Sequence, residues 1–180
     1  MTLSIFQLFY LFVTGLLLAL LEIEIEDENG WAKNLPTKRF KTKLMLKLGK
    51  ELTGYHLALQ TLLILFFHLP LVLNNKFNLD LEIIILTQYA LFIAYWDFMW
   101  FVLNPKFRLK NFKKGGVPWH QTWFIGLPIE YWLATFIFIF LPIITFGWPY
   151  LIIQLNYLIT YLIFIILTIL FFYLFFKKRL

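Results

Sequence analysis

The chain has 180 residues, of which 61% are hydrophobic, 21% aromatic and 14% charged. A soluble domain has about half apolar and a quarter charged residues, so this composition excludes an ordinary water-soluble domain and predicts a membrane protein. The lack of cysteine excludes disulfides and thiolate chemistry. The net charge of +6 is explained by membrane orientation, since lysine and arginine collect in cytoplasmic loops, and we expect no nucleic acid among the partners.

Five stretches are long and apolar enough to cross a bilayer, which takes about 20 mostly apolar residues. They cover residues 3–21, 53–74, 82–103, 128–147 and 149–176. Pro128 suits the first turn of the fourth stretch, and Glu130 suits the positive end of its dipole. We therefore expect an all-α fold, an integral membrane five-helix bundle that forms a single transmembrane domain over residues 1–180.

Lysine and arginine are distributed unevenly between the predicted loops. Fifteen of the sixteen lie between the first two spans, between the third and fourth spans, or at the end of the chain. These residues are Lys33, Lys38, Arg39, Lys41, Lys43, Lys47 and Lys50, then Lys106, Arg108, Lys110, Lys113 and Lys114, then Lys177, Lys178 and Arg179. Five spans place all three groups on one face, which predicts a multi-pass protein of the cell membrane with the N-terminus outside and the C-terminus cytoplasmic. We expect these loops to contact anionic lipid headgroups.

Residues 22–26 allow two interpretations. Their sequence, EIEIE, alternates acidic and apolar residues with the period of a strand, and Asn29–Gly30 is a favourable hairpin turn. The alternative extends the first helix to about Glu28, with Gly30 as its C-cap. Because acidic residues at a helix C-terminus oppose the helix dipole, we favour a short β-hairpin in the first cytoplasmic loop.

Asp97 is a carboxylate inside an otherwise apolar span. It precedes Asn104 by seven residues, which places it about 10 Å inside the cytoplasmic boundary at about 1.5 Å per residue. An ionised carboxylate at the centre of a span costs about 2.5–3.5 kcal/mol. Ala90 and Ala94 share its helical face and allow another helix to approach closely, so we expect Asp97 to face protein rather than lipid.

The predicted topology brings further histidine and carboxylate side chains to the depth of Asp97. Imidazole and carboxylate together suit Zn, Mn or non-haem Fe, so we expect a divalent-metal pocket that acts on a lipid or other membrane-dissolved substrate. The candidate ligands are Glu22, Glu24, His56, Asp97, His120 and Glu130. Asp97 and His56 are also the candidate catalytic residues. Depth excludes His68, which falls near the outer end of the second span.

Three alternatives to a metal site stay open at this point. Asp97 forms structural hydrogen bonds within the bundle, or the protein docks a partner through its aromatic ridges or basic loops, or it carries protons or ions. No H-E-x-x-H motif, histidine-rich box or glycine-rich phosphate loop occurs. Ser4, the single serine, lies at the outer end of the first span, which argues against a Ser-His-Asp site.

Three stretches, NGWAKNLPT at 29–37, ELTGYHL at 51–57 and DFMWFVLNPKF at 97–107, resemble a group of small prokaryotic multi-span membrane proteins with no assigned activity. The resemblance covers roughly residues 1–120 and continues loosely through WHQTWFIGLPIEYW at 119–132. It implies a bacterial or archaeal membrane protein, and it falls on the same segments that carry the candidate ligands.

Overall fold

A computed structural model describes residues 2–41, 51–75 and 77–176 of the chain. Its five long helices are α1 (Ile5–Glu26), α3 (Gly54–Leu73), α4 (Leu79–Leu103), α5 (Ile129–Phe146) and α6 (Pro149–Phe176). Each is long and apolar enough to cross a membrane. The five expected helices are therefore confirmed in a mostly helical fold with a few short strands, with helix ends displaced from the predicted ones by a few residues.

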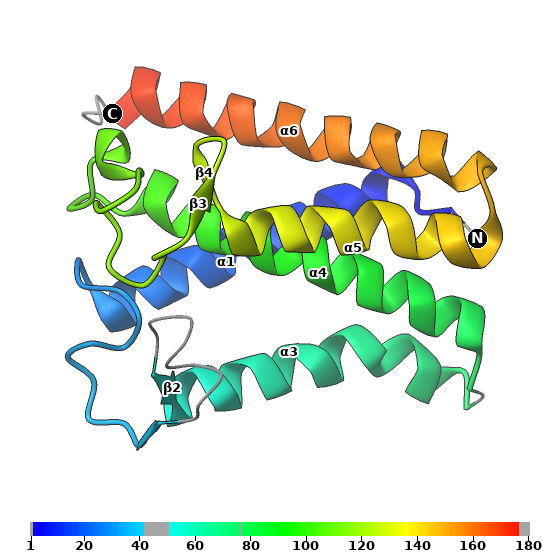
Figure 1. Ribbon diagram of the computed structural model, residues 1–180, viewed down its shortest axis with the longest axis horizontal. Coiled ribbons are helices and arrows are strands. Elements are labelled where there is room, and N and C mark those ends of the chain that lie inside the picture. Colours follow the sequence, from blue (N-terminus) through cyan, green and yellow to red (C-terminus); the bar gives the residue numbers. More distant parts are fainter. Residues whose placement is uncertain (1, 42–50, 76, 177–180) are drawn as a thin grey trace.

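Helix α4 lies at the centre of the bundle. It packs against α1, α3 and α5, while α6 lies on α5 and α1 (Figure 1). Phe12 of α1 stacks on Tyr95 of α4 with ring centroids 4.7 Å apart, and Tyr161 of α6 lies against the edge of Tyr95. Gly15 permits this close approach of α1 to α4, because a Cβ at that position would overlap the Tyr95 ring.

The segments that connect the helices are long at one end of the bundle and short at the other. Residues 27–41, 51–53 and 104–128 lie at one end, together with the C-terminal end of α6, and we call this the loop end (Figure 1). The start of α1 and the short α3–α4 and α5–α6 connections lie at the opposite end, which we call the turn end. Among the described residues, the long loops lie at the loop end, where polar side chains can gather above the helices.

Two short antiparallel ladders stiffen the loop end. Strand β1 (Arg39–Phe40) pairs with β2 (Leu52–Thr53), and β3 (Trp123–Phe124) pairs with β4 (Leu127–Pro128). The turn between β3 and β4 has positive φ at both central residues, Ile125 and Gly126, as the twist of a two-residue hairpin requires. A single 3₁₀ turn, η1 (Leu109–Asn111), lies in the same loop. The ladders therefore fix the starts of α3 and α5.

The prediction of a β-hairpin around Asn29–Gly30 is wrong. Residues 22–26 complete α1, and the ladder in this loop is formed instead by β1 and β2. Ala19, Glu22 and Glu26 lie on one buried face of α1, so packing of that face against the bundle outweighs both the strand-like alternation and the unfavourable dipole. The alternative of a longer first helix was closer, although α1 ends at Glu26 and is capped by Asp27.

The described lysines and arginines of both long loops lie at the loop end. Several residues used in the orientation argument lie outside the described residues, namely Lys43, Lys47, Lys50, Lys76, Lys177, Lys178 and Arg179. Which side of a membrane the loop end faces therefore stays a prediction.

Candidate functional site

A cavity of about 220 Å³ lies at the loop end between α1, α3, α4 and α5. The expected residues that line it are Glu22, His56, Asp97, His120 and Glu130. Glu24 is not among them, because it lies on the exposed face of α1. Glu26 lines the cavity instead, since residues four apart share one face of a helix whereas residues two apart do not.

Two carboxylates and one imidazole form the first group in this cavity, and we call it the Glu–Glu–His cluster. His56 Nε2 lies 3.4 Å from Glu26 Oε1 and 3.8 Å from Glu22 Oε1. One ligand atom from each of the three residues lies within 4.8 Å of the other two, and all three residues are buried. A spacing of this kind suits three ligands of one cation.

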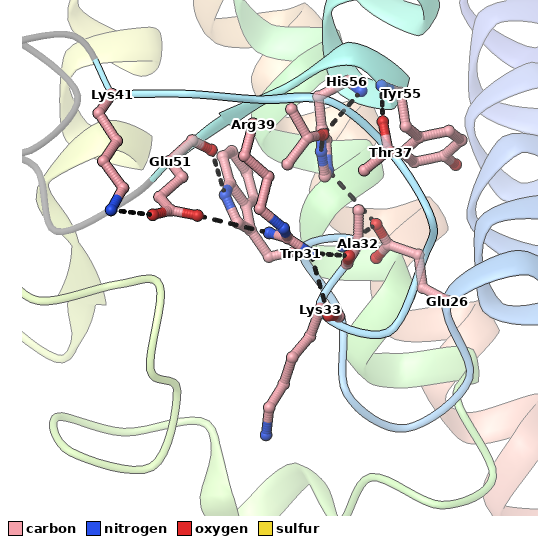
Figure 2. A network of polar contacts seen from close by, with 11 residues as sticks. Glu26, Trp31, Ala32, Lys33, Thr37, Arg39, Lys41, Glu51, Tyr55 and His56 are labelled. Carbon is pink, nitrogen blue, oxygen red and sulfur yellow. Dashed lines mark hydrogen bonds and ion pairs between the residues drawn. The ribbon is translucent and has the colours of Figure 1, made fainter.

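The imidazole of His56 is fixed from both sides. Thr53, the N-cap of α3, accepts a hydrogen bond from the His56 backbone N–H, and its Oγ1 lies 2.7 Å from Nδ1. The Trp31 ring stacks on the imidazole at 4.2 Å between centroids (Figure 2). Because Nδ1 is engaged by a hydroxyl, Nε2 is directed at the two carboxylates, which is the arrangement that orients metal-binding histidines.

A left-handed turn over Gly30–Lys33 covers this cluster. Gly30, Trp31 and Ala32 have successive φ values of 57°, 47° and 50°, a conformation that non-glycine residues adopt rarely and that the surroundings must stabilise. The turn directs the Ala32 backbone N–H to Glu26 Oε1 at 2.6 Å (Figure 2). Successive left-handed residues thus form a backbone cradle for the Glu26 carboxylate.

Arg39 and Glu51 hold the Gly30–Lys33 turn in place. The Arg39 guanidinium donates to the carbonyl oxygens of Ala32 and Lys33 at 2.6 and 3.0 Å, and it lies 3.6 Å from the Glu51 carboxylate. The Trp31 indole N–H donates to the Glu51 carbonyl at 2.9 Å. This network connects the loop surface to the buried His56 (Figure 2), so the first loop is part of the site and not only a connection.

Asp97, His120, Glu130 and Tyr131 form the second group, which we call the relay cluster. His120 Nε2 lies 3.0 Å from Asp97 Oδ2, and His120 Nδ1 lies 3.5 Å from Glu130 Oε2. The Tyr131 hydroxyl donates to the same Asp97 oxygen. The Asp97 and Glu130 side chains are 28% and 29% exposed, whereas His120 is almost fully enclosed at 3%, so the imidazole is held between two carboxyl groups that reach the cavity.

The two ring nitrogens of His120 contact carboxyl oxygens at different distances. Nε2 lies within hydrogen-bond distance of Asp97 Oδ2, whereas the 3.5 Å between Nδ1 and Glu130 Oε2 is an ion-pair distance without a hydrogen bond between these two atoms. Imidazole and carboxyl groups beside a cavity are the groups that exchange protons with a bound molecule.

Some residues of the pocket carried a weak sequence signal and others carried none. Glu26 would follow from Glu22 once α1 is assigned as a helix through residue 26, and Tyr131 is adjacent to Glu130. Trp31 gave no local indication, because its position over His56 depends on a loop folding back onto α3. Asp97 faces protein partners, in agreement with the small-residue argument for its helical face.

His68 lies at the turn end, away from the cavity, as the depth argument predicted. Its Nε2 lies 3.0 Å from Glu82 Oε1, and its Nδ1 lies 2.6 Å from the Ile64 carbonyl oxygen. Its side chain is 27% exposed. It therefore pairs with one partly exposed carboxylate at the opposite end of α3 from His56.

Comparison of the chain with protein-family models, with curated proteins and with solved structures finds no match in any of the three. A function is therefore inferred from the geometry of the Glu–Glu–His cluster and the relay cluster.

Proposed function

We propose that this protein is a membrane-embedded metal-binding protein whose loop-end pocket acts on a lipid or other membrane-dissolved substrate. The Glu–Glu–His cluster holds a divalent cation of the Zn, Mn or Fe type, and the relay cluster supplies acid–base groups. The observation that carries the proposal is the close approach of Glu22, Glu26 and His56 Nε2, with ligand atoms within 4.8 Å of one another in a buried position.

Charge supports a cation in the Glu–Glu–His cluster. Two ionised carboxylates beside a neutral imidazole carry two negative charges, and like charges close together in a buried site oppose one another strongly. A divalent cation neutralises both charges and accepts the Nε2 lone pair. Three protein ligands also leave a coordination position for water or substrate, as in catalytic zinc sites. When bound, the metal would polarise such a molecule or lower the proton affinity of a bound water.

The relay cluster then has a distinct part in the proposed activity. Asp97, His120 and Glu130 were also candidate ligands, but among the described residues the group whose ligand atoms lie within 4.8 Å of one another is Glu22, Glu26 and His56, and His120 Nε2 is within hydrogen-bond distance of Asp97. We therefore assign acid–base roles to these residues. Asp97 lies at the cavity surface and accepts from Tyr131 and His120, so it is the residue best placed to take a proton from, or return a proton to, a bound substrate.

Metal content tests the proposal directly. Wild-type protein and the variants His56→Gln and His68→Gln would be purified without added metal, dialysed against Zn, Mn or Fe(II), and measured by elemental mass spectrometry. We expect stoichiometric metal in the wild type and in His68→Gln, and a loss in His56→Gln. The matched histidine at the turn end controls for the loss of an imidazole as such.

Thermal unfolding of each variant in the apo state separates a lost ligand from a lost fold. If the wild type binds none of the three metals, or if His56→Gln folds and binds as well as the wild type, the metal proposal is wrong.

For the location, we propose that the loop end faces the cytoplasm of a prokaryotic cell, with its lysines and arginines on anionic headgroups of the cell membrane. The chain contains no cysteine, so single cysteines can be introduced without a background. Asn34→Cys at the loop end and Asn75→Cys at the turn end are both exposed positions. In intact cells, an impermeant thiol reagent should label only the second variant. Labelling of Asn34→Cys alone would reverse the orientation.

A further inference from the structure

The geometry points to a chemical class of ligand for the loop-end cavity: a membrane-dissolved molecule whose uncharged acyl carbonyl oxygen, as in an ester or an amide, accepts hydrogen bonds from N–H donors of the cavity wall. The donors are the indoles of Trp96 and Trp100 and the side-chain amide of Gln60. This inference rests on the proposed function for the identity of the cavity as the site of a membrane-dissolved substrate. It adds the chemical group by which that substrate is recognised.

The indoles of Trp96 and Trp100 are buried donors in the cavity wall. Both residues are 3% exposed, and both line the cavity. Among the residues that the structure describes, neither Nε1–H has a hydrogen-bond acceptor. An enclosed N–H without an acceptor destabilises a fold, and buried polar groups in native proteins are nearly always paired. A molecule bound in the cavity is a source of the acceptor that these two donors require.

The two indoles differ in the strength of the evidence that they give. The Trp100 ring lies nearly perpendicular to the Trp119 ring, with centroids 5.6 Å apart, and an aromatic face is a weak acceptor for an N–H. The single ring contact described for Trp96 is a tilted one with Phe92 at 6.5 Å. Trp96 is therefore the donor on which the inference depends most.

Other indoles of the same protein show which acceptor this group takes. Trp31, Trp123 and Trp132 each donate to a backbone carbonyl oxygen, at 2.9, 2.6 and 2.7 Å. Trp96 and Trp100 lie four residues apart and therefore share one face of α4, which is part of the cavity wall. A ligand with an acyl carbonyl supplies to this face the kind of oxygen that the backbone supplies to the other three indoles.

Gln60 adds a third donor from a neighbouring helix. The Tyr89 hydroxyl donates to Gln60 Oε1 at 2.6 Å, which fixes the amide and leaves its N–H bonds for another partner. Among the described residues, no acceptor contacts Gln60 Nε2. Gln60 follows His56 by four residues on the same face of α3. The acceptor group is thus expected within about one helical turn of the Glu–Glu–His cluster, where a bound divalent cation would polarise a carbonyl.

The composition of the cavity wall favours an uncharged oxygen over a phosphate or a carboxylate. No lysine or arginine is among the described residues that line the cavity, although such side chains are the usual partners of anionic groups. Lys33 and Arg39 line a second cavity, among the loops, instead. The three donors are neutral. A carbonyl oxygen has two lone pairs, so it can accept from two of these donors without a counter-charge.

Indole NMR tests the recognition directly. Protein with isotopically labelled tryptophan indoles would be purified in dodecyl maltoside, which contains no carbonyl group, and titrated with Zn-loaded and apo samples side by side. The probes are methyl dodecanoate, N-methyldodecanamide, dodecyl methyl ether and dodecyl phosphate, and Trp96→Phe assigns the Trp96 signal.

We expect the ester or the amide to move the Trp96 Nε1–H signal downfield, as a new hydrogen bond does, and the comparison of these two probes tells an ester site from an amide site. The signals of Trp123 and Trp132, which already donate to carbonyl oxygens, should stay in place. A Trp96 signal that neither carbonyl probe moves, or that the ether or the phosphate moves as far, overturns the inference.

A matched pair of variants tests the donor. Trp96→Phe keeps an aromatic ring and removes the N–H, whereas Trp148→Phe makes the same change at a tryptophan that is 74% exposed at the turn end. We expect affinity for the carbonyl probe to fall about tenfold in Trp96→Phe and to stay unchanged in Trp148→Phe, with stoichiometric Zn in both. Wild-type affinity in Trp96→Phe overturns the inference.

The two proposals fail separately. A carbonyl-dependent shift of the Trp96 signal in a protein that binds no metal would contradict the metal proposal and leave the carbonyl site standing. Stoichiometric metal without any such shift would do the reverse.

Discussion

Helix α3 carries a histidine at each end, and their surroundings differ. His56 is 6% exposed, stacks under Trp31 and faces two carboxylates of α1. His68 is 27% exposed in its side chain and faces one carboxylate, Glu82. An exposed ion pair contributes about 0–1 kcal/mol, whereas buried charges must be compensated or they destabilise the fold. Enclosure and an excess of carboxylates, rather than the histidine itself, distinguish a candidate site from an interfacial pair.

The largest effect should come from removing the carboxylates that surround His56. We expect the double variant Glu22→Gln, Glu26→Gln to lose stoichiometric metal, since glutamine neither carries the charge nor binds Zn, Mn or Fe comparably. Isothermal titration of the apoprotein with Zn measures this. Glu24→Gln, on the exposed face of the same helix, is the matched control and should bind as the wild type does. Equal losses in both variants would show that the effect is not local to the cluster.

A second large effect should come from the turn that covers His56, which has no counterpart at His68 in the part of the chain that the structure describes. Gly30→Ala places a side chain in a left-handed conformation and against the Trp119 ring, so we expect a loss of about 3 kcal/mol in unfolding free energy. Gly115→Ala has a similar positive φ but open space around it, and should lose only about 1 kcal/mol. Denaturant unfolding in mild detergent measures both. A difference near zero would mean that Gly30 does not pack on Trp119 as described.

An intermediate effect is expected at the residue that orients His56. Thr53→Val removes the hydroxyl beside Nδ1, and loss of such an outer partner lowers metal affinity about 10–100-fold. Thr53→Ser should restore most of the affinity, because it keeps the hydroxyl. Thr61→Val controls for the change of residue type. Thr61 lies on the same helix, and its hydroxyl donates a hydrogen bond to the Leu57 carbonyl oxygen. Zn titration of the four proteins gives the comparison, and an unchanged affinity in Thr53→Val would remove the orienting role.

The smallest effect is expected at the turn end. Glu82→Gln weakens the pair with His68, and because that pair is partly exposed, the unfolding free energy should change by less than about 1 kcal/mol. Metal affinity should not change. A loss of metal in Glu82→Gln would contradict the assignment of metal binding to the loop end alone.

Much of the fold could be predicted from the sequence because hydrophobic length alone identifies membrane-spanning helices. The depth of Asp97, His120 and Glu130 also followed from counting residues, and these three side chains do meet. Glu24 was predicted to line the pocket, but Glu26 lines it instead. The alternation of acidic and apolar residues at 22–26 fits a strand locally, whereas the packing of α1 makes this segment helical and determines which face is buried. The backbone turn at Gly30–Lys33 could not be predicted, since Arg39 and Glu51 stabilise it from a distance along the chain.

X-ray absorption spectroscopy of the Zn-loaded protein tests the central claim most directly, because it reports the ligands themselves. We expect a first shell of oxygen and nitrogen at about 2.0–2.2 Å with a single imidazole, and loss of the imidazole signal in His56→Gln with no change in His68→Gln. A shell without imidazole, or one that is the same in His56→Gln, would contradict the assignment of Glu22, Glu26 and His56 as the metal site.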